Sequence, residues 1–398
     1  MSDGASRTFG TSVLRRMSRA TSGEFIPEID GLRFIAIAAV VLHHLMAAYL
    51  TDTQRLGRVE LPADWIQTIG RSLLVRIAFC GYFGVHLFFV ISGFVLSLPF
   101  ARACRQGSVG PSLRAYYWRR IRRIEPPYFI NLTLCFALIV ATLSGWRVFV
   151  PHYLASLAYL HGIVFGEPSW ISGVTWSLEI EIQFYLLVPL LVGVFRVRHA
   201  GLRRIVLIAL VFGLSILSPT VLDHLRAPRL GLSLLNYLQY FFAGFLLADL
   251  YLDDRRRNRS LVWDLLAAIV SVLMVMIISR HPGGGFLLPA LVIALFVTLF
   301  LGRVAHQVIT LRPIVICGGM CYTIYLYHNV IINLLQPSLG RLSLVWLPLK
   351  LDFLIQSLLM LPVIAVVCVA LFVLVERPFM TRWKSAADKD GTAPVVAT

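Results

Sequence analysis

Residues 31–50 read GLRFIAIAAVVLHHLMAAYL, an apolar run interrupted by one arginine and two histidines. Its length matches the roughly 20 residues that an α-helix needs to cross a hydrocarbon core about 30 Å thick. Similar runs recur along the chain, which is 58% hydrophobic and only 14% charged. A soluble domain carries about 45–50% apolar and about 25% charged residues, so lipid must solvate the surplus apolar side chains. The sequence therefore predicts an all-α integral membrane protein.

The chain contains apolar runs for a bundle of about ten transmembrane helices. They lie near residues 31–50, 77–99, 127–146, 174–195, 204–222, 232–252, 260–279, 285–302, 314–335 and 352–375. One more run, 152–166, is short. Counting it as a crossing would move every later arginine cluster to the outer side, so we expect it to dip into the membrane or lie at the outer surface.

The net charge of +16 arises from 36 Lys+Arg against 20 Asp+Glu. The arginines form clusters between apolar runs, as the positive-inside rule predicts, and they give no indication of nucleic-acid binding. These clusters indicate a multi-pass protein of the cell (inner) membrane with cytoplasmic N- and C-termini. We predict a cytoplasmic polar tail at 1–28, a transmembrane domain at 29–380 and a disordered cytoplasmic tail at 381–398.

The first span holds the clearest candidate site. Ionisable groups in hydrocarbon cost about 2.5–3.5 kcal/mol each on insertion scales, so those present need a reason. Arg33 and His44 fall within about 20° of one helix face and about 16 Å apart along the axis. Asp30 precedes them at a predicted N-cap. Two alternatives stay open: a functional site, or a lipid-binding arginine and a structural histidine.

The span at 174–195 contains two carboxylates, Glu179 and Glu181. They are two positions apart, so at most one of them can face a given site. Glu181 and His44 are predicted at a similar depth, about 10 Å below the outer surface. Matched depth permits a pairing of a base with the group that orients it.

Other polar groups admit simpler explanations. Ser92 with Gly93 is typical of close helix approach. His328 lies beside tyrosines, where a histidine most often makes a helix–helix hydrogen bond. A stretch predicted as a cytoplasmic loop interleaves aromatic residues with arginines, and lipid headgroups alone explain its charge. Arginine also suits the bidentate binding of phosphates. The cysteines show no paired metal-ligand spacing, so we predict no metal site.

Together these residues resemble membrane acyltransferase family 3, whose members include sugar and polysaccharide O-acetyltransferases and macrolide acyltransferases. The resemblance covers roughly residues 26–380 and rests on six elements in the expected order. They are Ile29 to Arg33 followed by His44, Gly84 to Phe94, Arg119 to Pro126, Trp176-Ser177-Leu178 followed by Glu181, Tyr322 to His328, and Glu376-Arg377-Pro378.

Three positions depart from the family pattern. His86 stands where the family often has aspartate, Ile182 replaces a second glutamate, and Glu179 replaces a small residue. We expect these changes to affect the choice of acceptor or acyl group.

The resemblance implies an O-acyltransferase that moves an acyl group, most often acetyl, from acyl-CoA to a hydroxyl group. The acceptor would be a glycan, a lipid-linked sugar or a macrolide. Acyl-CoA would be a co-substrate, and we expect no permanently bound cofactor. The implied catalytic residues are His44, as base or transient acyl carrier, and Glu181. The implied acyl-CoA-binding residues are Arg33, Arg119, Arg120, Arg122 and Arg123. The implied supporting residues are Asp30, His86, Ser92, Trp176, Ser177, Tyr325 and His328.

A secondary transporter or exporter of a glycan or lipid is the alternative, because buried histidine and glutamate also relay protons. Against it, the sequence shows no internal repeat of the kind many transporters have. Family members that finish a transfer outside the cytoplasm can carry a further hydrolase-like domain. We recognise none here, so we expect the membrane domain to act alone or with a separate partner.

Overall fold

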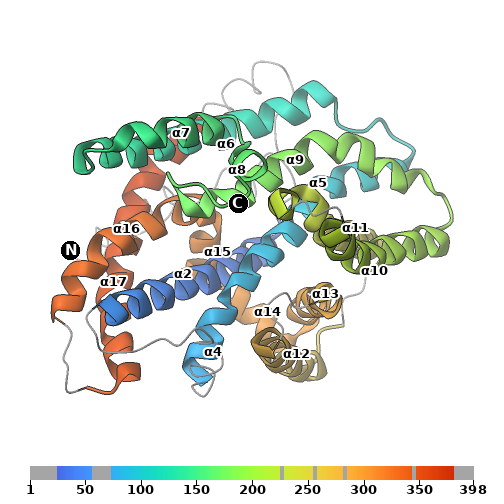
Figure 1. Cartoon of the computed structure of the whole chain (residues 1–398). Helices are drawn as coiled ribbons and strands as arrows, with labels where there is room; N and C mark the ends of the chain where they lie inside the picture. The colour runs from blue at the N-terminus through green and yellow to red at the C-terminus, as the bar shows by residue number, and fades with distance from the viewer. Residues whose placement is uncertain are drawn as a thin grey trace, which may run out of the picture. The chain divides into compact units, whose positions relative to one another are not determined.

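The computed structural model describes residues 25–55, 73–224, 228–253, 258–280, 285–342 and 347–380. The described residues are mainly helical and form no strand, only an isolated bridge between Ser260 and Gly302 (Figure 1). This confirms the predicted all-α class. The predicted tails fall almost entirely outside the described residues, which begin at residue 25 and end at residue 380.

Within the described ranges, seven helical stretches are long and apolar enough to cross a membrane. They are Pro27–Asp52, Leu73–Gln106, Leu113–Thr142, Gly173–Arg196, Ala200–Ser218, Leu261–Ile278 and Lys350–Met380. An eighth is formed by α15 (Arg312–Gly319) with α16 (Cys321–Leu342). The predicted number of about ten is not confirmed, because two predicted spans are shorter helices, α11 (Leu238–Asp253) and α13 (Leu287–Leu301).

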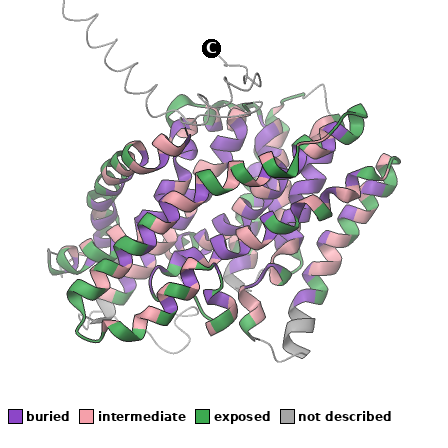
Figure 2. Ribbon diagram, turned by 90° about the horizontal axis from the view of Figure 1, so that it is seen from above, coloured by how far each residue is buried: buried purple, intermediate pink, exposed green. Residues whose placement is uncertain are grey.

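Large apolar side chains lie on the outside of the helices. Leu190 of α9 (Trp176–Leu191) is 76% exposed, and Val366 of α17 (Leu349–Leu371) is 70% exposed. Figure 2 shows buried and exposed residues alternating along the helices. Such surfaces suit lipid rather than water, so the chain is a multi-pass membrane protein.

The predicted span at 314–335 is not straight. Its two helices, α15 and α16, are bent by 73° across a break at Met320. A side chain on Gly318 of α15 would overlap the carbonyl oxygen of Asp30 in α2 (Pro27–Arg55). The helix that precedes the break therefore lies directly on the α2 backbone, an approach that only glycine permits.

The chain folds into two compact units, which are described separately. The first unit comprises the described residues of Met1–Phe79, Arg119–Asn131 and Val308–Thr398. The second comprises those of Cys80–Trp118 and Leu132–Gln307. In the first unit, α2 packs mainly against α15 and α16. In the second, α5 (Phe83–Gln106) packs mainly against α11.

The crossing of α5 and α11 depends on two glycines. A side chain on Gly93 would overlap the carbonyl oxygen of Phe241, and one on Gly244 would overlap that of Val90. The two backbones are therefore in direct contact, which confirms the predicted role of Gly93 in close helix approach.

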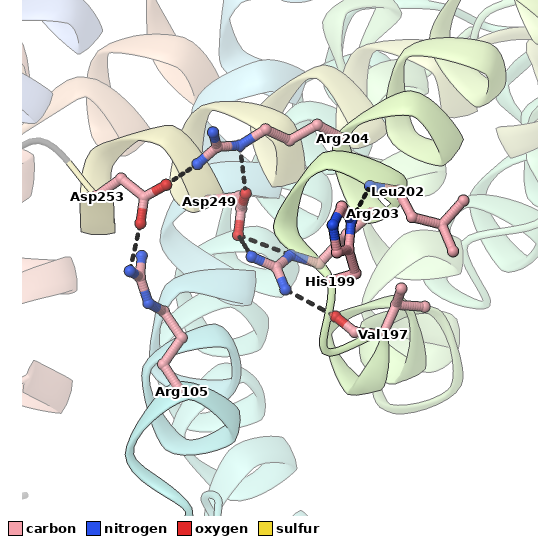
Figure 3. A network of polar contacts seen from close by, with 8 residues as sticks. All are labelled: Arg105, Val197, His199, Leu202, Arg203, Arg204, Asp249 and Asp253. Atoms are coloured by element: carbon pink, nitrogen blue, oxygen red, sulfur yellow. Dashed lines mark hydrogen bonds and ion pairs between the residues drawn. The ribbon is translucent and has the colours of Figure 1, made fainter.

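An ion network ties the C-terminal ends of α5 and α11 to the start of α10 (Ala200–His224) in the second unit (Figure 3). The buried Asp249 binds Arg203 at 2.6 Å and Arg204 at 2.9 Å. Asp253 joins Arg204 to Arg105. From the sequence, the arginine clusters indicate only the orientation of the chain in the membrane. In the structure, these arginines also neutralise two carboxylates at the end of an apolar bundle.

The stretch 152–166 contains no helix that could cross a membrane, as predicted. It folds into α7 (Val150–Leu157) and α8 (His161–Phe165), each far shorter than the roughly 20 residues required. The His152 ring lies between Phe165 and Trp170, with ring centroids 4.1 and 4.0 Å away. Its Nδ1 is 2.8 Å from Nε2 of His161, and burial lowers the pKa of His161.

Replacing Gly93 with alanine should destabilise the protein by about 1–3 kcal/mol, because the added methyl group forces α5 and α11 apart. Thermal unfolding of the purified protein in detergent measures this. Gly213→Ala in α10 is the matched control, since a methyl group there meets open space. If the two variants unfold at the same temperature, the close crossing is wrong.

Candidate functional site

The stretch that contains Arg119, Arg120, Arg122 and Arg123 is helical, so the prediction of a loop there is wrong. It forms the first turns of α6 (Leu113–Thr142), where the Ser112 hydroxyl accepts from the N–H of Ala115. The composition of this stretch is compatible with a helix, because arginine is a good helix former. The helix exposes Arg122 and half-buries the other three candidates, Arg119, Arg120 and Arg123.

Two hydrogen bonds fix this basic segment to α16 within the first unit. The Tyr322 hydroxyl donates to the Ile124 carbonyl at 2.7 Å, and the Asn131 amide donates to the Leu326 carbonyl at 3.0 Å. Tyr322 precedes His328 by six residues, about 9 Å along the helix. The basic segment of α6 therefore meets α16 about two turns before His328.

Asp30 does not cap α2, which corrects a second expectation. The helix begins at Pro27, so Asp30 lies inside its first turn, where the helix dipole favours a negative charge. Its carboxylate binds the Arg33 guanidinium at 2.5 Å, and the Arg33 side chain is only 11% exposed. The ion pair holds the guanidinium at the beginning of the same helix that carries His44.

His44 lies against His328 from α16. Nδ1 of His44 is 3.3 Å from Nε2 of His328, and the ring centroids are 4.9 Å apart. His328 is fully buried and His44 is half-buried. The sequence favoured a structural hydrogen bond for His328. The structure provides such a bond, and its partner is the candidate catalytic residue.

Two backbone carbonyl groups determine which ring nitrogen carries the proton in each neutral histidine. Nδ1 of His328 is 2.8 Å from the Ile324 carbonyl, which accepts only, so this nitrogen carries the proton and Nε2 keeps a lone pair. Nδ1 of His44 is 2.8 Å from the Val40 carbonyl and donates there and toward His328. This arrangement leaves Nε2 of His44 as its basic nitrogen.

Neighbouring rings restrict the pair further. His43 packs edge-on against His44 at 5.3 Å, and its Nδ1 is 3.1 Å from the Phe79 carbonyl. The buried Tyr325 ring lies 6.3 Å from His328. These contacts, all in the first unit, restrict rotation of the two imidazoles.

Glu181 lies in the second unit and is bound by two hydroxyl groups. Ser92 of α5 and Tyr185, one turn further along α9, both donate to its Oε1. Ser92 therefore does more than permit close packing, since it bonds a carboxylate within a membrane-spanning helix. The pairing of His44 with Glu181 stays a prediction, because the two residues belong to different units.

Glu179 is 1% exposed and faces a different partner. Its Oε2 accepts from the N–H of Gly162 at 2.8 Å, at the start of α8. Glu179, where this chain departs from the family pattern, therefore holds the start of α8, one of the short helices that follow α6. Also in the second unit, His86 and Ser177 are buried, and Trp176 is half-buried.

The predicted site residues thus divide between the units. The first unit brings together the histidine pair, Tyr325 and the ion pair of Asp30 with Arg33, and it also carries the four α6 arginines. The second contains Glu181 with Ser92, Trp176, Ser177 and His86. Among the described residues, no group of three or more potential ligands is arranged to bind a metal ion.

The fold and the polar contacts define a multi-pass membrane protein whose helices carry a histidine pair in one unit and a hydroxyl-bound glutamate in the other. The chain belongs to acyltransferase family 3, because residues 26–377 match the sequence profile described as an acyltransferase domain.

Several curated relatives are similar. Peptidoglycan O-acetyltransferase OatA of Listeria monocytogenes is 24% identical over 81% of this chain and 52% of its own length. O-acetyltransferase OatA of Staphylococcus aureus is 24% identical over 81% of this chain and 53% of its own. Acyltransferase MdmB of Streptomyces mycarofaciens is 29% identical over 42% and 38%. The chain spans about half the length of the OatA relatives. No solved structure matches it.

Replacing Tyr185 with phenylalanine should lower the stability by about 1–3 kcal/mol, because the half-buried carboxylate of Glu181 loses a donor. Thermal unfolding of the single and double variants forms a double-mutant cycle with Glu181→Leu. The effect of Tyr185→Phe should shrink in the Glu181→Leu background. An equal effect in both backgrounds would show that the two side chains do not interact.

Proposed function

We propose that this chain is a membrane-embedded O-acyltransferase that moves an acetyl group from acyl-CoA to a hydroxyl group of a glycan or glycosylated metabolite. Family membership supports acyl transfer. The OatA relatives are O-acetyltransferases by name, which supports O-acetylation, and MdmB is an acyltransferase by name.

The observation that carries the proposal is the hydrogen-bond chain through the histidine pair. It runs from Nδ1 of His44 to His328 and ends on the Ile324 carbonyl, so Nε2 of His44 is the nitrogen that can accept a proton. When that nitrogen is protonated, the Nδ1–H still donates to His328. We therefore propose that His328 orients His44, while the orienting role that the resemblance implies for Glu181 stays a prediction.

The chemical step follows from this arrangement. The acceptor oxygen attacks the carbonyl carbon of the thioester while its proton passes to Nε2 of His44. The carbon–sulfur bond then breaks, and the leaving CoA sulfur takes the proton from the imidazolium. Nε2 of His44 returns to its neutral form, ready for another cycle.

The guanidinium groups of the first unit suit the donor. Arg33 lies near the beginning of the helix that carries His44. The α6 segment directly after the arginines meets α16 at Tyr322, about 9 Å along that helix from His328. Coenzyme A has a pyrophosphate and a 3′-phosphate, which arginine binds in bidentate fashion. We place these arginines at the cytoplasmic face of the inner membrane, with both termini inside, because positive charge favours that side.

His44→Ala should lower the rate of acyl transfer by about 10²–10⁴, the usual contribution of a positioned base. The assay incubates purified protein with labelled acetyl-CoA and a glycan acceptor, and measures CoA release and labelled product. His306→Ala, in α14 (Arg303–Ile309), is the control. Full activity of His44→Ala would contradict the mechanism. A transporter would release no CoA even as wild type.

Arg33→Ala should weaken acetyl-CoA binding by about 10- to 100-fold, the loss expected for a charge-assisted hydrogen bond. Thermal stabilisation by increasing acetyl-CoA measures the affinity. Arg259→Ala, an exposed arginine of the second unit, should bind as wild type does. Asp30→Asn separates loss of the ion pair from loss of the phosphate ligand. Unchanged affinity in Arg33→Ala would remove its assigned role.

A further inference from the structure

Aromatic rings surround His86 in the second unit. Its imidazole lies 4.5 Å from the Tyr240 ring and 5.9 Å from the Tyr237 ring, both measured between centroids. The Trp176 ring lies 5.5 Å from Tyr237. His86, Trp176 and Tyr240 lie near the N-terminal ends of α5, α9 and α11, and Tyr237 directly precedes α11.

Three polar atoms around this cluster are buried and make no hydrogen bond among the described residues. They are Nδ1 of His86, Nε2 of Gln183 and Oε1 of Gln239. The His86 imidazole also lies near the Tyr82 backbone one turn earlier, so the two amide atoms of Gln183 and Gln239 are the stronger indication. Buried polar groups are nearly always bonded, so unpartnered amide atoms such as these indicate a bound ligand or water.

The segment that precedes α11 connects these groups. Oε1 of Gln183 accepts from the N–H of Leu234 at 2.8 Å, and Nε2 of Gln239 donates to the Asn236 carbonyl at 2.8 Å. Gln183 follows Trp176 by seven residues, so the two share a face of α9. Each amide thus uses one atom to bind residues 234–236 and leaves the other unbound.

The cluster lies at the opposite end of α5 from the ion network. His86 precedes Arg105 by nineteen residues, about 28 Å along the helix and close to the hydrocarbon thickness. If the arginine network faces the cytoplasm, as the positive-inside rule expects, the cluster faces the outer surface. Ser92, which binds Glu181, lies about 9 Å deeper along α5.

We propose that His86, Trp176, Tyr237, Tyr240, Gln183 and Gln239 form an acceptor subsite that binds a neutral sugar ring. A sugar offers hydroxyl groups that donate and accept, and apolar C–H faces that pack on aromatic rings. The unbound Gln183 nitrogen is a donor and the unbound Gln239 oxygen an acceptor, which matches this chemistry. The cluster contains no carboxylate and no guanidinium, so it favours an uncharged sugar. This proposal rests on the proposed function, since it names the acceptor.

The test is equilibrium binding of sugars to the purified full chain in nanodiscs without acyl-CoA, measured by saturation-transfer NMR. The probes are methyl β-D-glucoside, N-acetylglucosamine, glucuronic acid and cyclohexanol. We expect the two neutral sugars to bind, and the charged sugar and the cyclic alcohol to bind at least tenfold more weakly. Trp176→Ala should weaken neutral-sugar binding about tenfold, and Trp176→Phe should restore most of it.

Gln183→Glu is the sharper variant, because it keeps the acceptor for Leu234 and replaces the unbound donor with an acceptor oxygen. It should also weaken binding about tenfold. Phe286→Ala is the control, since this exposed ring lies outside the cluster and should bind as wild type does. Wild-type affinity in Gln183→Glu and Trp176→Ala, or no sugar binding by the wild type, overturns the subsite.

His44→Ala separates this proposal from the proposed function, because it should bind the sugars normally while its acetyl transfer is about 10²–10⁴ slower. If the wild type transfers acetyl groups but binds no sugar, the subsite alone is wrong. If it binds sugars but releases no CoA, the subsite stands and the acyltransferase is wrong.

Discussion

A polar side chain inside a bilayer has no water to bind, so another helix must supply its partner. The bond between His44 of α2 and His328 of α16 meets this constraint in the first unit. The bond between Ser92 of α5 and Glu181 of α9 meets it in the second. In each case glycines bring neighbouring backbones close, Gly318 against α2 and Gly93 against α11. Hydrogen bonds between polar side chains and close packing at glycines therefore both hold the helices together within each unit.

The two units carry different chemical groups, and the two proposals assign them different tasks. The first holds the basic groups, an imidazole pair together with the guanidinium groups that would bind the phosphates of the donor. The second holds a hydroxyl-bound carboxylate and an uncharged aromatic cluster suited to a sugar. We infer that the donor and the acceptor are recognised by separate surfaces, so substitutions could change the acceptor without affecting acyl-CoA.

Much of this arrangement could be predicted from the sequence, because hydrophobic length determines which segments become membrane helices. Gly93 and the short helices at 152–166 were predicted correctly. The break at Met320 and the partner of His44 could not be, since both depend on contacts between residues far apart in sequence. The same holds for Asp249, whose partners lie on another helix.

The most direct test of the central claim is whether His44 and His328 act as one catalytic unit. Single-turnover acetyl transfer should be measured for wild type, His44→Ala, His328→Ala and the double variant. If His328 acts through His44, the double variant is no slower than His44→Ala, because the orienting residue has nothing left to orient. If the two losses instead multiply, the histidines act independently and the paired base is contradicted.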